Sequence, residues 1–187
     1  MIKSKKEYKE FLKADCEMTG IDKFSWISKY IDKRYKFYKS LRKTEYLINC
    51  KKGYLWRYII KLSIYRHNAL CIKLGWTIPP NVFGKGLAIV HHGTIVVSGD
   101  SRIGDNCRIH VCVNIGNALA KGIDGAPIIG NNVYIGPGAK LFGGIRLGDN
   151  LAIGANAVVN ESFPMGNCTI AGVPAIVISN NDSKKLY

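Results

Sequence analysis

The chain has 187 residues and a mass of 20.7 kDa, a size that suits one globular domain with an appendage. Hydrophobic residues make up 47% of it and charged residues 21%, which excludes global disorder and a fold that depends on disulfides. The formal net charge is +14, and residues 1–75 carry most of it, with 19 Lys and Arg against 7 Asp and Glu.

The N-terminal segment is charged from Lys3 onward and contains no apolar stretch of the kind that a secretory signal requires. No uncharged apolar run approaches the roughly 20 residues of a membrane span. We therefore expect a cytoplasmic protein.

Residues 1–75 predict a basic α-helical cap. Apolar residues recur at helical spacing over residues 4–48, which indicates two or three helices. Residues 51–74 have the strongest helical pattern, and Gly75 with Pro79 and Pro80 ends it. Two apolar stripes predict that this helix is buried on more than one side. The stripes are Leu55, Ile59, Leu62 and Ala69, and Ile60, Ile64, Cys71 and Leu74.

The positive charge of the cap has several interpretations. No helix-turn-helix, zinc-finger or RNA-binding motif is present, so we expect no nucleic-acid partner. Attraction to an acidic acceptor, or peripheral association with an anionic membrane surface, remains open beside the simpler interpretation of a solvated face.

Residues 76–178 contain an internal repeat of six residues. Each unit begins with an aliphatic residue that is usually followed by glycine, which is the pattern of a parallel β-helix built from hexapeptides. The leading residues point inward, and stacked coils join them into one apolar column. They are Ile103, Ile109, Ile115, Ile129, Ile135, Leu141, Leu147, Ile153 and Val159, with Phe83, Ile89 and Val97 upstream.

Two irregularities interrupt this period, and such interruptions are often functional loops. The first lies between Ile89 and Val97 and contains His91 and His92. The second spans residues 117–127, which are too polar and glycine-rich for the column and are predicted to leave it as a loop. Residues 179–187 are expected to form a C-terminal tail.

The six cysteines contain no CxxC pair and match no zinc-site spacing, so we expect buried free thiols.

The repeat region resembles the left-handed β-helix acyltransferases, and within them the serine acetyltransferase-like branch, which includes capsular-polysaccharide O-acetyltransferases. The resemblance rests on GKGLAIVHHGTIVV (84–97), IGDNCRIHVCVNIG (103–116), APIIGNNVYIGPGAKLFG (126–143), IGANAVV (153–159) and AGVPA (171–175). It implies a mainly β fold: a left-handed parallel β-helix of about four coils, preceded by the helical cap. It also implies acetyl-CoA as the donor, a hydroxyl acceptor, no metal, and a homotrimer with its active site between adjacent subunits.

The same resemblance assigns candidate site residues. His91 falls where the family has its general base, a role that suits an imidazole near neutral pH. His92 and His110 are candidates for substrate binding, although neighbouring residues of a strand point to opposite sides, so His91 and His92 are not expected to share one role. Contacts with CoA are implied for a further set, namely Asn117, Gly136, Pro137 and Ala155.

Three departures from serine acetyltransferases bear on the acceptor. Val90 replaces an aspartate before the base, Trp76 and Thr77 occupy the region of a second aspartate, and Ala126 replaces a histidine. The groups that handle a charged amino acid are thus missing. We therefore expect a saccharide acceptor, in the synthesis of a capsule or another surface polysaccharide, with serine as the alternative.

Other mechanisms remain as weaker alternatives. A metal-dependent hydratase needs three converging histidines, and no suitable third one follows His91 and His110. A covalent acyl-enzyme would need Cys107 or Cys112 as its nucleophile. A scaffold without activity would not need His91.

Overall fold

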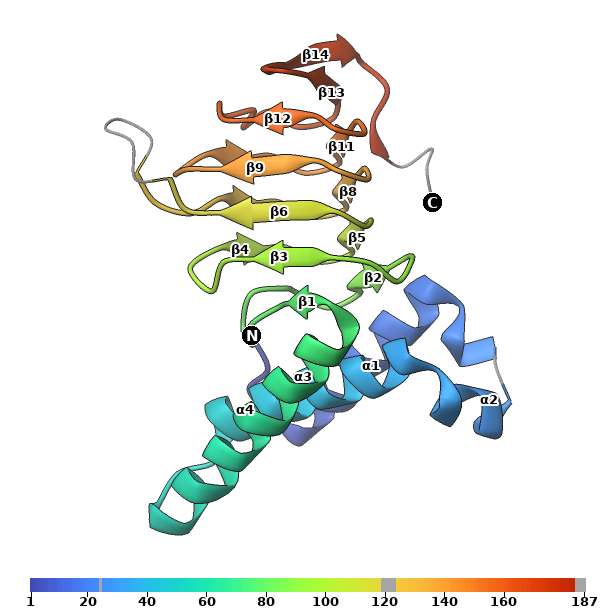
Figure 1. Ribbon diagram of the computed structural model, residues 1–187, viewed down its shortest axis with the longest axis vertical. Helices are drawn as coiled ribbons and strands as arrows, with labels where there is room; N and C mark the ends of the chain where they lie inside the picture. Colours follow the sequence, from blue (N-terminus) through green and yellow to red (C-terminus); the bar gives the residue numbers. More distant parts are fainter. Residues whose placement is uncertain (24, 119–123, 184–187) are drawn as a thin grey trace.

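The structure, a computed structural model, describes residues 1–187 apart from residue 24, residues 119–123 and residues 184–187, so part of the expected loop and tail lies outside it. A helical cap at one end adjoins a stack of β-coils at the other (Figure 1). The chain passes from cap to coils at Gly75, between the last helix and the first strand.

The cap consists of α1 (Lys5–Thr19), a 3-10 turn η1 (Ile21–Lys23), α2 (Trp26–Ile31), α3 (Lys33–Cys50) and α4 (Tyr54–Leu74). Side chains start two of these helices: Ser4 accepts from the Glu7 amide, and Asp32 accepts from the amides of Arg34 and Tyr35. Gly75 ends α4 with φ of 73°, in the left-handed region that favours glycine. The helices that the periodicity predicts are therefore present.

The predicted burial of α4 on two sides is wrong. His67 and Cys71 are buried and Leu74 is half-buried, whereas Leu55 and Leu62 are 69% and 55% exposed. The reason is the packing: α3 covers one face of α4, and α4 otherwise projects away from the coils (Figure 1).

Short parallel strands form the β-coils. Three sheets run along the stack, in the orders β1-β3-β6-β9-β12, β4-β7-β10 and β2-β5-β8-β11-β13-β14, and among the strands of the described chain only β13 and β14 pair antiparallel. The strands are β1 (Trp76–Thr77), β2 (Ala88–Ile89), β3 (Ile95–Val97), β4 (Arg102–Ile103), β5 (Arg108–Ile109), β6 (Val113–Gly116), β7 (Ile128–Ile129), β8 (Tyr134–Ile135), β9 (Lys140–Phe142), β10 (Arg146–Leu147), β11 (Ala152–Ile153), β12 (Val158–Val159), β13 (Thr169–Gly172) and β14 (Ala175–Ser179).

The predicted leading residues form the core of these coils. Each is at most 5% exposed, and register pairs such as Ile109 with Ile135 place them directly above one another. The apolar column is therefore confirmed. Asparagines in the left-handed conformation support one corner through a chain of side-chain amide hydrogen bonds. This chain runs from Asn106 to Asn132, Asn150 and Asn167.

The second interruption of the repeat lies between β6 and β7. Ala118 pairs antiparallel with Gly125, and the Ala118 amide donates to the Gly125 carbonyl at 3.2 Å. The chain thus turns back on itself here before β7 begins, and residues 119–123 between them are outside the description.

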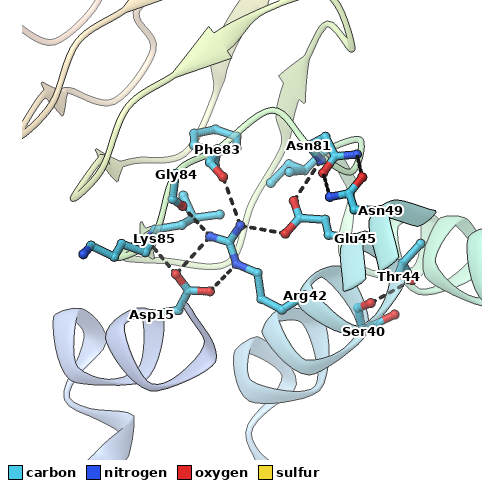
Figure 2. A network of polar contacts seen from close by, with 12 residues as sticks. Asp15, Ser40, Arg42, Thr44, Glu45, Asn49, Asn81, Phe83, Gly84 and Lys85 are labelled. Atoms are coloured by element: carbon cyan, nitrogen blue, oxygen red, sulfur yellow. Dashed lines mark hydrogen bonds and ion pairs between the residues drawn. The ribbon is translucent and has the colours of Figure 1, made fainter. Parts of the chain in front are cut away.

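A buried ionic network joins the cap to the first coil (Figure 2). The guanidinium of Arg42 donates to Asp15 at 2.7 and 3.0 Å and to Glu45 at 2.9 Å. It also donates to the carbonyls of Phe83 and Gly84, at 3.0 and 2.6 Å. Because all three charged groups are fully or almost fully buried, each needs these partners to offset its lost hydration.

The two carboxylates of this network also accept from backbone amides of the coil. Asp15 accepts from Leu87 and Glu45 from Asn81, both at 2.8 Å. The network therefore fixes how the cap sits on the coil. None of the helices in the described chain is long and apolar enough to cross a membrane.

Candidate functional site

The segment that carries His91 connects β2 to β3, and the cap and β1 hold it by its backbone. Within the connection, the Val90 carbonyl accepts from Arg34 at 3.5 Å, and the Gly93 carbonyl accepts from the Trp76 indole at 2.7 Å. Immediately before it, the Ile89 amide donates to the hydroxyl of Tyr38 at 2.8 Å. Anchored on both sides, the connection presents His91 as an exposed side chain.

His91 and His92 lie in different surroundings. The ring centroid of His91 is 5.8 Å from that of His110, on the next strand of the same sheet. The ring of His92 instead stacks on Trp76, with centroids 6.4 Å apart and planes 12° apart. The two imidazoles therefore have different neighbours, in agreement with the expected opposite orientation.

His110 follows β5 and lies between two rings. Its centroid is 5.0 Å from that of Tyr134 on β8, so His91, His110 and Tyr134 form a row across three coils. Burial, the charge of Arg108 and the neighbouring His91 lower the pKa of His110 below its ordinary value. His110 therefore tends to stay neutral when the neighbouring His91 becomes protonated.

Arg108 shares the outer surface of this sheet with His110, because both alternate with the buried Ile109. Across the strands it pairs in register with Ala88 and Tyr134. Its Nε atom is buried and has no hydrogen-bond partner in the part of the chain that the structure covers. Arg108 thus places an unpaired cationic donor in the row of rings.

Three of the four residues implied for CoA binding lie near this row. Gly136 and Pro137 follow β8, which pairs with β5, the strand that ends just before His110. Ala155 follows β11, the next strand of the same sheet. Pro137 and Ala155 are exposed. A Cβ on Gly136 would come within 2.7 Å of the Ile153 carbonyl oxygen, so only glycine fits at this position.

Asn117 lies elsewhere. It follows β6, the middle strand of the sheet β1-β3-β6-β9-β12, at the edge where these strands end, whereas His91 lies before β3 begins. Its side chain accepts from Ser98 at 2.5 Å and donates to Asp100 at 2.9 Å. Within a single chain the structure does not bring Asn117 together with the row of rings.

Within the described part of the chain, no carboxylate takes the place of the missing aspartates. Val90 contributes only its carbonyl, Trp76 is a buried indole, and Ala126 is half-buried. Asp32 lies near this backbone, but it is paired with Arg34 at 3.0 Å. Across the described ranges, no Asp or Glu hydrogen-bonds or ion-pairs with His91, His92 or His110.

The other polar candidates have structural surroundings. His67 is buried, and its Nε2 lies 2.9 Å from the Ile78 carbonyl, which ties α4 to the chain after β1. All six cysteines are free thiols, and burial raises the pKa of Cys107 to about 12. Among the residues that the structure describes, no three His, Cys, Asp or Glu side chains gather closely enough to hold a metal ion.

Sequence reasoning missed the groups that support His91. Arg34 and Tyr38 are far from it in sequence, and no local pattern marks either one. Trp76 carries a signal, because it stands where the resembling family has an aspartate. Arg108 and Tyr134 occupy ordinary outward positions of the repeat, so only the stacking of coils shows that they adjoin His110.

The comparisons support the resemblance. Residues 126–161 match the family described as bacterial transferase hexapeptide (six repeats). The serine acetyltransferase of Synechococcus elongatus is 37% identical over 95 residues, which is 51% of this chain and 38% of that protein. The chain spans between 38% and 60% of the length of the curated relatives that it matches.

Solved structures match over almost the whole chain. The serine acetyltransferase of Brucella abortus strain S19 covers 96% of this chain and 72% of its own, with a TM-score of 0.73 and 26% identity. A serine acetyltransferase solved with CoA covers 93% of this chain and 71% of its own, with a TM-score of 0.70 and 25% identity. The left-handed parallel β-helix with a helical N-terminal region is thereby confirmed, as is the resemblance to hexapeptide-repeat acyltransferases.

Proposed function

We propose that this chain is an O-acetyltransferase that moves an acetyl group from acetyl-CoA to a hydroxyl of a small acceptor. The observation that carries the proposal is the exposed His91, which the cap and β1 hold beside the row formed with His110 and Tyr134. The match to serine acetyltransferases, including one solved with CoA, supports the donor.

In this reaction His91 is the general base. It takes the proton of the acceptor hydroxyl as the oxygen attacks the thioester carbonyl, the carbon–sulfur bond breaks, and the protonated imidazole returns the proton to the leaving thiolate. A positive charge on His110 would disfavour a proton on the neighbouring His91. Because the pKa of His110 is lowered, His110 stays neutral and His91 can accept the proton.

We propose that acetyl-CoA lies along the surface of Gly136, Pro137 and Ala155. The missing side chain of Gly136 lets the backbone of the next coil approach closely, and Pro137 and Ala155 beside it are exposed, which offers small groups for the narrow pantetheine arm to contact. Asn117 is distant from this path within one chain, so in our proposal its contact with CoA requires a neighbouring subunit. A homotrimer, which the resemblance implies, is the expected assembly, and the cytoplasm is the expected location of the reaction.

Among acceptors, L-serine has the stronger support, because the matched relatives and solved structures are serine acetyltransferases. This reverses the preference for a saccharide that the sequence departures suggest. The guanidinium cation of Arg108, on the outer surface of the sheet beside His110, offers an anchor for the carboxylate of serine, which the departures alone do not reveal.

A saccharide hydroxyl remains the second candidate, on one specific observation. The ammonium group of serine calls for a carboxylate, and none in the described structure contacts the three histidines of the site. A neutral acceptor needs no such partner.

Release of CoA from acetyl-CoA tests the proposal, measured with L-serine and with a panel of mono- and oligosaccharides. We expect turnover with serine, reduced at least about 100-fold in His91→Asn, because general-base catalysis contributes on that scale. His92→Asn separates the roles of the two histidines: we expect a smaller loss than in His91→Asn, because the His92 ring stacks on Trp76 and does not face His110. Acetyl transfer to sugars but not to serine would show that a saccharide is the acceptor. Equal turnover by wild type and His91→Asn would refute His91 as the base.

A further inference from the structure

The side of the cap that the coils leave uncovered carries an unusual combination of charge and apolar surface. From Lys33 to Gly75 the chain has 12 Lys and Arg and a single acidic residue, Glu45, which is buried in the Arg42 network. Helix α4 itself contains no acidic residue. A surface of this kind attracts anions and repels other cations.

Helix α4 also exposes a continuous apolar stripe, which we call the α4 stripe. Its members are separated by three, four or seven residues and therefore share one side of the helix, opposite the side that packs on α3. Most are more than half exposed, up to 80% for Ile72. The stripe consists of Tyr54, Tyr58, Leu62, Tyr65 and Ile72.

Cations border the α4 stripe on both sides. By helical geometry Arg57 and Lys61 flank it along one edge, and Arg66 and Lys73 flank it along the other. All four are exposed, and none has a carboxylate within 4.0 Å among the residues that can be described. Aromatic and aliphatic residues between basic margins are typical of helices that lie in a membrane interface.

A groove between α3 and α4 opens beside this stripe. It has a volume of about 290 Å³, and Lys43 and Arg66 line it together with the hydroxyls of Ser40 and Ser63. Leu62, a member of the α4 stripe, forms part of the same wall. The Ser63 hydroxyl shares a hydrogen bond with that of Thr44 at 2.8 Å. The two cations and the Ser40 hydroxyl suit a phosphate, and the adjoining leucine suits an acyl chain.

We propose that the α4 stripe and this groove dock the protein on an anionic phospholipid surface, with the groove receiving a lipid phosphate. A second copy of the chain fits less well, because symmetric pairing of two α4 stripes would bring their cations together without any carboxylate of α4 between them. A nucleic acid would neutralise the cations but would leave Leu62 and Ile72 uncovered. The docking places the cap, rather than the coils, against the bilayer.

Co-sedimentation of the full chain with lipid vesicles tests the docking, with vesicles of phosphatidylcholine alone beside vesicles that also contain phosphatidylglycerol. We expect binding to the anionic vesicles only, weakened by salt. The double variant Lys43→Gln/Arg66→Gln should bind about 30-fold more weakly, since each basic residue near such a surface contributes about fivefold. Leu62→Ser should also weaken binding, and circular dichroism confirms that each variant is folded.

The matched control is Lys5→Gln/Lys9→Gln, which removes the same charge from exposed positions on α1. Equal loss in the two double variants would overturn the groove as a specific site, and equal binding to both kinds of vesicle would overturn the anionic preference. If the chain associates with itself in the absence of vesicles, and Leu62→Ser abolishes this association, the α4 stripe binds a second copy of the chain rather than a membrane. Displacement of vesicles by duplex DNA, with no effect of Leu62→Ser, would assign the face to nucleic acid. None of these readouts depends on acetyl transfer.

Discussion

The indole N–H of Trp76 donates a hydrogen bond to the carbonyl oxygen of Gly93 at 2.7 Å. The first strand of the coil thereby holds the end of the segment that carries His91. The same indole packs edge-on against Phe37 of α3, with ring centroids 4.8 Å apart, and stacks on His92. Trp76, which with Thr77 occupies the region where the resemblance implies an aspartate, thus links the cap to the proposed base through packing and one hydrogen bond.

Trp76→Phe should lower kcat about fivefold and leave the KM for acetyl-CoA unchanged. Phenylalanine preserves most of the packing but removes the donor to Gly93, and one such hydrogen bond contributes about 1 kcal/mol. Steady-state kinetics measures the effect. Trp56→Phe, in α4, is the control for the same chemical change away from the site, and an equal loss of kcat there would contradict the positioning role.

Arg108→Gln should raise the KM for L-serine at least about tenfold, because it removes a charge-assisted hydrogen bond to a carboxylate, which contributes about 1.5–3 kcal/mol. The KM for acetyl-CoA should stay the same. Arg146→Gln, on the outer surface of β10, serves as the control. An unchanged KM for serine in an active Arg108→Gln enzyme would refute the proposed carboxylate anchor.

Acidification should destabilise the protein through the buried His67 and the half-buried His110. Burial is the first cause that lowers the pKa values of His67 and His110 below 6.5 in the folded state. Between those lowered values and about 6.5 the unfolded chain binds more protons, so the free energy of unfolding falls as the pH decreases. His110→Gln removes one of these groups, and its Tm should decline less than that of wild type between about pH 7 and 5. His92→Gln, at an exposed position, should decline as wild type does, and identical declines in all three proteins would contradict the assignment.

Arg42→Met should lower the free energy of unfolding by about 3–5 kcal/mol, because it leaves the buried carboxylates of Asp15 and Glu45 without their cation. Urea denaturation provides the measurement. Lys6→Met breaks an exposed pair with Glu10 and should change stability by less than about 1 kcal/mol. A loss in Arg42→Met no greater than in Lys6→Met would show that the network does not hold the cap on the coil.

Replacement of Cys107 or Cys112 by alanine should leave acetyl transfer within about threefold of wild type. Burial raises the pKa of Cys107 to about 12, so its thiol is not a nucleophile near neutral pH. Cys112 is exposed, and direct transfer does not require it. Kinetics of the two variants and mass spectrometry of enzyme incubated with acetyl-CoA test this, and an acetylated cysteine that forms and turns over would establish the covalent route instead.

The periodicity of the chain was sufficient to predict its architecture. Leading residues such as Ile109 and Ile135 must repeat every six positions, because a β-helix coil returns each to the same inward place. His91 was recognisable because its neighbours in sequence carry the resemblance. Local sequence therefore determined the coil, the break that contains His91 and the approximate bounds of the last helix of the cap.

Tertiary structure alone decided what surrounds His91 and which face of α4 is buried. Arg34, Tyr38 and Trp76 reach its segment from at least 15 positions away, and His110, Arg108 and Tyr134 join it because coils stack. The outward side of α4 has the same apolar spacing as a buried side, and only the absence of a covering element in the described chain distinguishes the two. Periodicity records which residues share a face, whereas the partner of that face depends on contacts between segments distant in sequence.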